Sequence, residues 1–232
     1  MNDTEKRRTK RRRKAGKAYG TTDLGNGMVQ ATPEAVLRAM GGLPPDLEWE
    51  VMAPNVIPIL PRRRPMPPHA GEPFRVTLPP GIPTGFGIDI GPAFLVVGES
   101  LLGTWPIGPA ELVATALENL RTRLRPVRAR DLVRQSIDGV PVRVLQSGLG
   151  CASALVLVPD ELARIFGEVP QTLIAPMRDL LISLPPDVDR AFVAWLNDEF
   201  AEMDPNGLAL DAFAYEGGAL RYEALRPPAQ WD

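Results

Sequence analysis

Three polar residues that stand among apolar neighbours are the candidates for chemistry in this sequence. Asp89 lies between two isoleucines in GIDIG, and Arg178 and Asp179 stand together in PMRDLL. Apolar surroundings can shift the pKa of a carboxyl group, and an acid–base pair needs only proximity in space. These residues support one hypothesis, a small-molecule-binding protein or enzyme that uses carboxylate and Arg chemistry. The alternative is structural: a turn residue, or an Arg-paired carboxylate at the end of a strand.

Other catalytic sites are not indicated. The chain has one cysteine, Cys151 in GCASALVLV, and one histidine, His69, in a proline-rich segment. A zinc site needs about four nitrogen or sulfur ligands, and a serine or cysteine nucleophile needs a base. GFG at residues 85–87 lacks the third glycine of a dinucleotide-binding loop, and the sequence contains no P-loop pattern. We therefore expect no metal site, no cofactor and an inert Cys151 thiol.

Positive charge is concentrated at the N-terminus. Residues 1–17 hold nine of the 26 basic and two of the 28 acidic residues, so residues 18–232 carry 17 Arg and 26 acids, a net charge of −9. Clustered cations on a flexible chain attract polyanions through counterion release. The sequence therefore predicts nonspecific binding of nucleic acid or an acidic protein, and the alternative is a tail that solubilises the chain or folds onto its acidic body. The predicted contact residues are Lys6, Arg7, Arg8, Lys10, Arg11, Arg12, Arg13, Lys14 and Lys17.

A second run of arginines lies between residues 121 and 134. It could extend the same basic surface, or its members could pair with acids of the body. No aromatic residues are interleaved with either basic segment, so neither offers a platform on which bases could stack. The run comprises Arg121, Arg123, Arg125, Arg128, Arg130 and Arg134.

The chain divides into an arm and one domain. Residues 1–31 contain one aromatic residue, Tyr19, and a glycine-rich stretch, so we expect them to be disordered. Residues 32–232 are expected to form a single α+β globular domain. Prolines recur too often for central strands between residues 44 and 83, so this segment should be largely irregular, with short edge strands in VMAPNVIPIL and a strand over residues 74–78.

Periodicity predicts two main amphipathic helices and several short strands. One helix runs from Pro109 to just before Pro126, and the other from Asp187 to near Pro205. Shorter helices follow the expected caps Thr32 and Asp160, while residues 154–158 could form a buried strand or a helical turn. Because the elements lack a regular βαβ rhythm, we predict a mixed, mostly antiparallel sheet. The expected strands are 86–90, 93–97, 140–145, 173–175, 180–184, 210–215 and 219–225.

Three segments together resemble a known family. In order and spacing, IGPAELVATALENLRTR, CASALVLV and LIAPMRDLLISLP are similar to the YtpQ-like family, a bacterial domain of unknown function. The similarity covers residues 86–225 and rests on ENL at residues 118–120 and on the P-x-R-D element at residues 176–179. It implies an α+β fold and brings no activity. The arm and the segment before residue 83 depart from the family's pattern.

The remaining features concern compartment and function class. No run of about eighteen uncharged apolar residues occurs, and the chain opens with charge, so we expect a cytoplasmic protein without a membrane span. The leading hypothesis is a non-enzymatic interaction or accessory protein whose cationic arm binds polyanions. The oligomeric state stays open at this stage.

Overall fold

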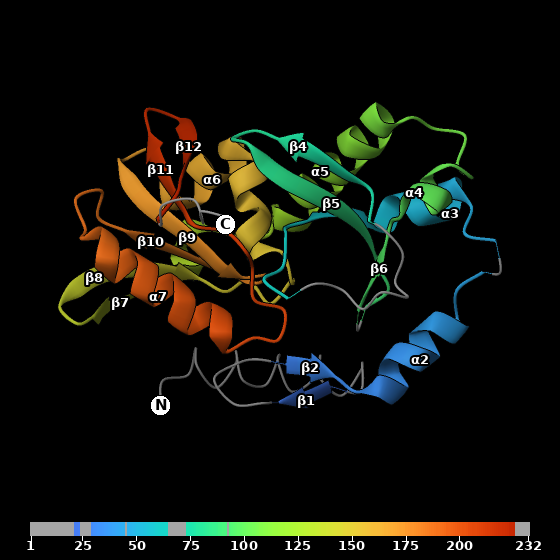
Figure 1. The fold of residues 1–232 in the computed structure, drawn as a ribbon, viewed down its shortest axis with the longest axis horizontal. Coiled ribbons are helices and arrows are strands. Elements are labelled where there is room, and N and C mark those ends of the chain that lie inside the picture. The colour runs from blue at the N-terminus through green and yellow to red at the C-terminus, as the bar shows by residue number, and fades with distance from the viewer. Residues whose placement is uncertain (1–20, 24–28, 45, 65–72, 92, 226–232) are drawn as a thin grey trace, which may run out of the picture.

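The computed structural model describes residues 21–23, 29–44, 46–64, 73–91 and 93–225, and it has the predicted α+β fold. All strand pairings among these residues are antiparallel. They form a six-stranded sheet and a four-stranded sheet that lie next to each other, and a separate two-stranded hairpin (Figure 1). The single mixed sheet predicted from the sequence is therefore two antiparallel sheets.

The six-stranded sheet consists of three hairpins in the order β12-β11-β9-β10-β8-β7. Its two central strands are buried along their whole length, which explains why both are mostly apolar; Gln171, Thr172 and Ser183 are their buried polar residues. The edge strand β7, in contrast, is almost entirely exposed. The bounds are β7 Val133–Ile137, β8 Val140–Leu145, β9 Gln171–Met177, β10 Leu180–Leu184, β11 Ala212–Glu216 and β12 Ala219–Glu223.

Helices cover both faces of this sheet. Ile174 and Ile182 pack with Val193 and Leu196 of α7 (Arg190–Glu202) on one face. Their neighbours along the strands, such as Leu173, point to the other face and pack with η4 (Ala152–Leu157), a 3₁₀ helix, and α6 (Pro159–Phe166). The alternation of side chains along β9 and β10 thus divides the core into two layers.

Two predicted helix starts were wrong. The long C-terminal helix begins after Asp189, whose carboxylate accepts a hydrogen bond from the Ala191 amide (3.0 Å), and not at Asp187. In α6, Pro159 takes the first helical position, where its fixed φ and missing N–H are well tolerated. Val158 is consequently the N-cap and Asp160 lies in the first turn.

The four-stranded sheet is centred on β5 (Ile82–Asp89). One edge of β5 pairs with β3 (Val56–Ile59), while β4 (Arg75–Leu78) and β6 (Phe94–Val96) pair with the first and second parts of its other edge. The predicted strands 86–90 and 93–97 therefore correspond to the end of β5 and to β6, which pair with each other. Residues 44–83 hold more regular structure than expected, including α3 (Trp49–Met52) and η1 (Ala53–Asn55). Pro58 is accommodated because β3 is an edge strand.

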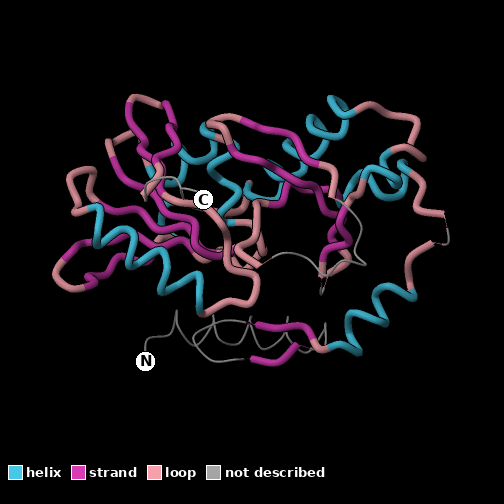
Figure 2. Tube along the Cα trace, viewed as in Figure 1, coloured by secondary structure: helices cyan, strands magenta, loops and turns pink. Residues whose placement is uncertain are grey.

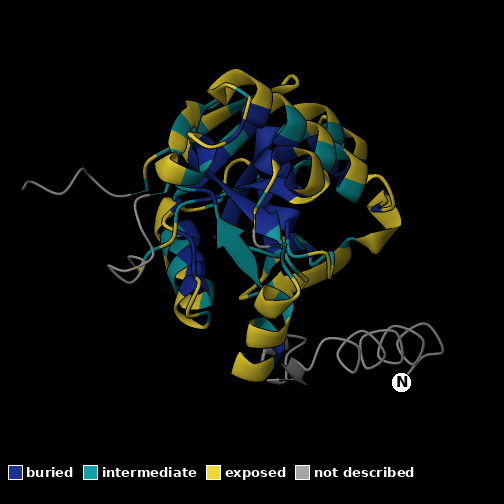
Figure 3. Cartoon of the chain, turned by 90° about the vertical axis from the view of Figure 1, so that its right-hand side faces the viewer, coloured by how far each residue is buried: buried dark blue, intermediate teal, exposed yellow. Residues whose placement is uncertain are grey.

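Helix α5 (Pro109–Leu124) connects the two sheets through the core. Its first half places Leu112 and Ala116 among the buried residues of the four-stranded sheet. Its second half places Leu120 and Leu124 in the core beneath the six-stranded sheet. Between them, the Asn119 amide donates to the carbonyls of Ala53 (2.7 Å) and Val56 (2.8 Å). The helix therefore fixes the relative position of the sheets, and buried residues occupy the centre of the molecule (Figure 3).

A backbone contact between distant segments also joins the sheets. The Arg63 amide donates to the Gly207 carbonyl and the Ala209 amide to the Pro61 carbonyl, both at 2.8 Å. Gly207 is required here, because a Cβ atom at this position would lie 2.0 Å from the Ala201 carbonyl oxygen. The segment that follows β3 is thereby tied to the segment that precedes β11.

The N-terminal elements lie away from the two sheets (Figure 2). Helix α2 (Pro33–Gly41) begins at the predicted cap, since the Thr32 hydroxyl accepts from the Ala35 amide (3.2 Å), and Ala35 is its buried residue. Within the segment predicted to be disordered, β1 (Thr21–Asp23) pairs with β2 (Val29–Ala31), where β-branched residues favour strand structure. Residues 1–20 lie outside the described residues.

Candidate functional site at the sheet junction

The sheet junction brings together the three predicted candidates, Asp89, Arg178 and Asp179, and joins them to others. We define it as Asp89, Phe94, Arg123, Cys151, Arg178 and Asp179. The turn between β9 and β10 supplies Arg178 and Asp179, so the six-stranded sheet contributes one side. Strands β5 and β6 contribute Asp89 and Phe94 from the other sheet, and α5 contributes Arg123.

Asp89 is held at the end of β5 by two contacts. Its Oδ2 forms an ion pair with Arg123 of α5 (2.5 Å), and both side chains are about four-fifths buried, with 19% and 22% exposed. Its Oδ1 accepts a hydrogen bond from the Gly91 amide (2.7 Å), which stabilises the turn into β6. This is the structural role that the sequence left open, an Arg-paired carboxylate that also caps a turn.

Asp179 organises the loop that precedes η4. The Ser147 hydroxyl donates to Oδ1, the Gly148 amide donates to Oδ2 at 2.6 Å, and the amides of Cys151 and Ala152 reach Oδ1 at 3.3 and 3.2 Å. Successive backbone N–H groups of this kind form a concave anion-binding surface. Here the protein's own carboxylate occupies that surface, so the loop is held in place by an internal anion.

Arg178 lies against an aromatic ring instead of pairing directly with a carboxylate. Its Cζ is 3.6 Å from the centroid of the Phe94 ring, and its Nε donates to the Gly150 carbonyl (3.0 Å). Gly150 adopts φ +71°, and a Cβ atom there would be 3.4 Å from the guanidinium. Glycine is therefore favoured both by the backbone conformation and by the close approach of Arg178. Burial lowers the pKa of Arg178 to about 10, although Asp89 and Asp179 favour its charged form.

Cys151 is unsuited to nucleophilic chemistry. The side chain is 1% exposed, and burial, followed by the nearby charge of Asp179, raises the pKa of the thiol to about 12. Arg123 and Arg178 oppose this shift without reversing it. Since the thiolate is the reactive form, the thiol is inert at neutral pH, consistent with the interpretation of GCASALVLV as a buried segment.

The junction is therefore an internally satisfied ion network. Both candidate carboxylates accept from partners within the protein, and neither is paired with a second carboxylate for proton transfer in the described contacts. Phe94 was not singled out from the sequence, and Arg123 was named only as a member of the second arginine run. The available signal for Arg123 was its spacing of four residues from Asn119, which places both on the face of α5 that meets the four-stranded sheet.

The other predicted sites lie mostly outside the described residues. The nine arm residues between Lys6 and Lys17 and His69 fall in segments that the structure does not describe. Within the described ranges, no group of three or more His, Cys, Asp or Glu side chains could hold a metal ion. In the second arginine run, Arg121 pairs with Asp160 and Arg123 with Asp89, so part of this run serves the body's own acids.

Comparisons with known proteins complete the description. None of the helices in the described part of the chain is long and apolar enough to cross a membrane. No family model, no curated protein and no solved structure matches the chain. The similarity of residues 86–225 to the YtpQ-like family thus stays a prediction from the sequence.

Proposed function

We propose that this protein is a non-enzymatic interaction protein that binds polyanions, nucleic acid foremost, through its basic N-terminal arm. The observation that carries the proposal is the separation of charge along the chain. Nine basic residues fall within the first 17 positions, whereas residues 18–232 have a net charge of −9. A body that is acidic as a whole repels a polyanion, so we expect the main attraction to come from the arm, where each phosphate contact releases a counterion.

The alternative function, an enzyme or ligand binder that uses Asp89, Arg178 and Asp179, has less support. A catalytic carboxylate must be free to exchange a proton with a substrate. Asp179 accepts from one hydroxyl and three amides, and Asp89 is ion-paired with Arg123. Releasing either would leave buried donors or a largely buried guanidinium without a partner, which is costly. The junction supports a role in holding the sheets together.

The experiment that tests this proposal is fluorescence anisotropy with labelled duplex and single-stranded nucleic acid. The full-length protein is compared with a full-length variant whose nine basic arm residues are replaced by Gln, so that chain length is unchanged. We expect the unmodified protein to bind, and its affinity to fall by about 10³-fold or more between 50 and 200 mM salt if six or more phosphates are contacted. Equal binding by both proteins, or no binding by either, would refute the proposal.

A further inference from the structure

The described part of the chain carries a second concentration of positive charge, where α5 ends and β7 begins. Between residues 125 and 134 the chain contains four arginines, all exposed, and one acid, Asp131. Asp131 lies in the short 3₁₀ helix η3 (Ala129–Asp131), and its Oδ2 accepts from the Arg128 amide (2.8 Å). The carboxylate is thus used to cap that helix.

Some of the guanidinium groups near this turn are explained by helix capping. Arg128 donates to the carbonyls of Arg125 and Val127, and Arg164 of α6 donates to the carbonyls of Leu124 (3.1 Å) and Val127 (2.6 Å). The last carbonyls of a helix are unsatisfied and partially negative, so cations are stabilised there. Arg164 also pairs with Glu161. These two arginines therefore have a structural role.

Three arginines remain without such an explanation. Within the described residues, no hydrogen bond or ion pair is formed by the side chains of Arg125, Arg130 and Arg134, which we call the arginine face. Arg134 stands directly opposite Arg143 on the neighbouring strand, an arrangement of like charges that is unfavourable in isolation. Burial first, and then the charge of Arg134, lowers the pKa of Arg143. Internal stability does not account for this placement.

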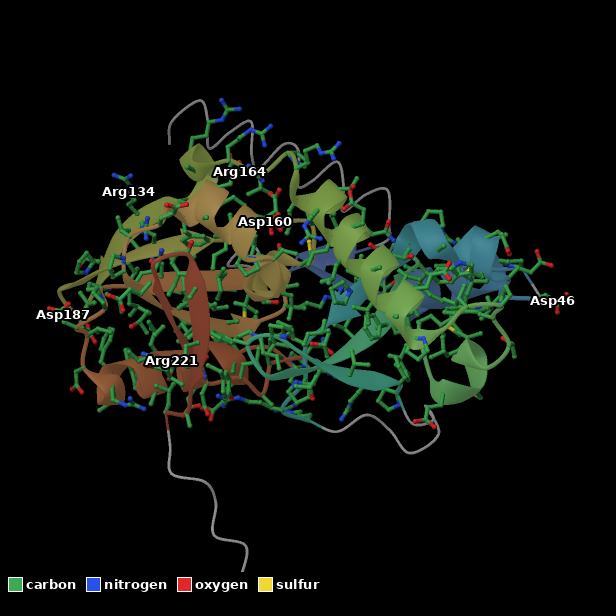
Figure 4. All side chains as sticks on the ribbon, turned by 90° about the horizontal axis from the view of Figure 1, so that it is seen from above. Asp46, Arg134, Asp160, Arg164, Asp187 and Arg221 are labelled. Atoms are coloured by element: carbon green, nitrogen blue, oxygen red, sulfur yellow. The ribbon has the colours of Figure 1, made fainter. Side chains whose placement is uncertain are left out.

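The arginine face is continuous with the end of α6. Helix α6 lies against η3, and Arg134 and Arg164 lie along the same margin of the molecule (Figure 4). The acids at this margin are engaged, because Asp160 pairs with Arg121 and Glu161 with Arg164. The free positive charge of Arg125, Arg130 and Arg134 is therefore not neutralised locally.

We propose that the arginine face binds the phosphate backbone of a double-stranded nucleic acid, as a second contact beside the arm. This inference rests on the proposed function. Guanidinium groups match phosphate oxygens in geometry and charge. A duplex is favoured over a single strand because residues 121–165 contain no aromatic side chain on which an unpaired base could stack. The contact is with the backbone and carries no base specificity.

The test uses a triple variant, Arg125→Gln, Arg130→Gln and Arg134→Gln, in the full-length protein. A matched control replaces Arg38, Arg64 and Arg75 with Gln, which are also exposed and also lack a side-chain partner among the described residues. Both variants change the net charge equally. Anisotropy with a labelled duplex is recorded from 50 to 200 mM salt, and thermal unfolding confirms that each variant is folded.

We expect the arginine-face variant to bind the duplex about tenfold or more weakly, with a salt slope reduced by about 2.7 for three lost contacts. The control should stay within about twofold of the unmodified protein. Equal affinities for the two variants would overturn the inference while leaving the arm's role intact. If the unmodified protein bound a labelled single strand more tightly than the labelled duplex, the assignment of the arginine face to a duplex would be overturned.

Combining the two sets of substitutions separates the two proposals. If the arm variant binds normally and only the arginine-face variant is weakened, the arm proposal fails and the inference about the face stands. If only the arm variant is weakened, the arm proposal stands and the inference about the arginine face fails. A loss in both, with a larger loss in the combined variant, supports both contacts.

Discussion

Two groups of arginines in this protein, at the sheet junction and on the arginine face, use the same side chain in opposite ways. At the sheet junction, Arg178 stacks on Phe94 and Arg123 pairs with Asp89. On the arginine face, Arg125 and Arg130 extend into solvent with no partner among the described residues. Burial and partners, not residue type, therefore separate arginines that hold a fold from arginines that can bind another molecule.

The largest effect is expected in the reactivity of Cys151, which reports how well the junction is shielded from solvent. A thiol whose pKa is raised to about 12 exposes roughly a thousandfold less thiolate at pH 8 than an ordinary cysteine. Reaction with a disulfide reagent should therefore be about a thousandfold slower in the folded protein than in denaturant, and should accelerate as pH rises towards 12. Since the chain has one cysteine, the signal is unambiguous. If the labelling rates of the folded and the denatured protein lay within about tenfold of each other, the burial of Cys151 at the junction would be contradicted.

Removal of the Asp179 carboxylate should cause the largest loss of stability. Asp179→Ala leaves the Ser147 hydroxyl and the amides of Gly148, Cys151 and Ala152 without their acceptor. We expect the free energy of unfolding, measured by urea denaturation, to fall by about 3 kcal/mol. The matched control is Asp160→Ala, which removes an exposed partner of Arg121 and should cost at most about 1 kcal/mol. Similar losses for both variants would refute the anchoring role.

Replacement of Arg178 should have a smaller effect. Arg178→Met keeps the length and most of the packing of the side chain but removes the contact with the Phe94 ring and the hydrogen bond to Gly150. We expect a loss of about 2 kcal/mol in urea denaturation. Arg221→Met, at a position where the side chain is 75% exposed, should change stability by about 0.5 kcal/mol or less. A loss no greater than that of the control would show that Arg178 is dispensable for the fold.

The smallest change in stability is expected on the arginine face. Because the side chains of Arg125, Arg130 and Arg134 form no hydrogen bond or ion pair within the described residues, their joint replacement by Gln should alter the free energy of unfolding by about 0.5 kcal/mol or less. Relief of the like charge opposite Arg143 favours a slight gain. A loss comparable to that of Arg178→Met would mean that these side chains support the fold after all.

The elements that depend on local periodicity could be predicted from the sequence. The spacing of apolar residues from Leu112 to Leu124 defined α5, and Pro109 and Pro126 marked its ends. The apolar runs of β9 and β10 were evident because both faces of these strands are covered. What could not be predicted was the division into two sheets. It depends on pairings of strands that are distant in sequence, such as β3 with β5 and β8 with β10, which no local pattern encodes.

The candidate site was predictable in three of its members but not in their roles. Asp89, Arg178 and Asp179 were named from their apolar neighbours, which left open whether they meet; in the structure Asp89 and Asp179 both favour the charged form of Arg178. Their partners come from α5, β6 and the loop before η4, which are remote in sequence. Whether a carboxylate is free or saturated is decided by those partners, so the choice between chemistry and structure required the fold.

The most direct test of this account measures duplex affinity and unfolding free energy for two variants side by side. We predict that Arg178→Met loses stability but, under conditions where it is folded, binds the duplex within about twofold of the unmodified protein. The arginine-face variant should keep its stability and lose about tenfold in affinity. If Arg178→Met lost affinity as well, or the arginine-face variant retained it, the division of the arginines into structural and binding groups would be contradicted.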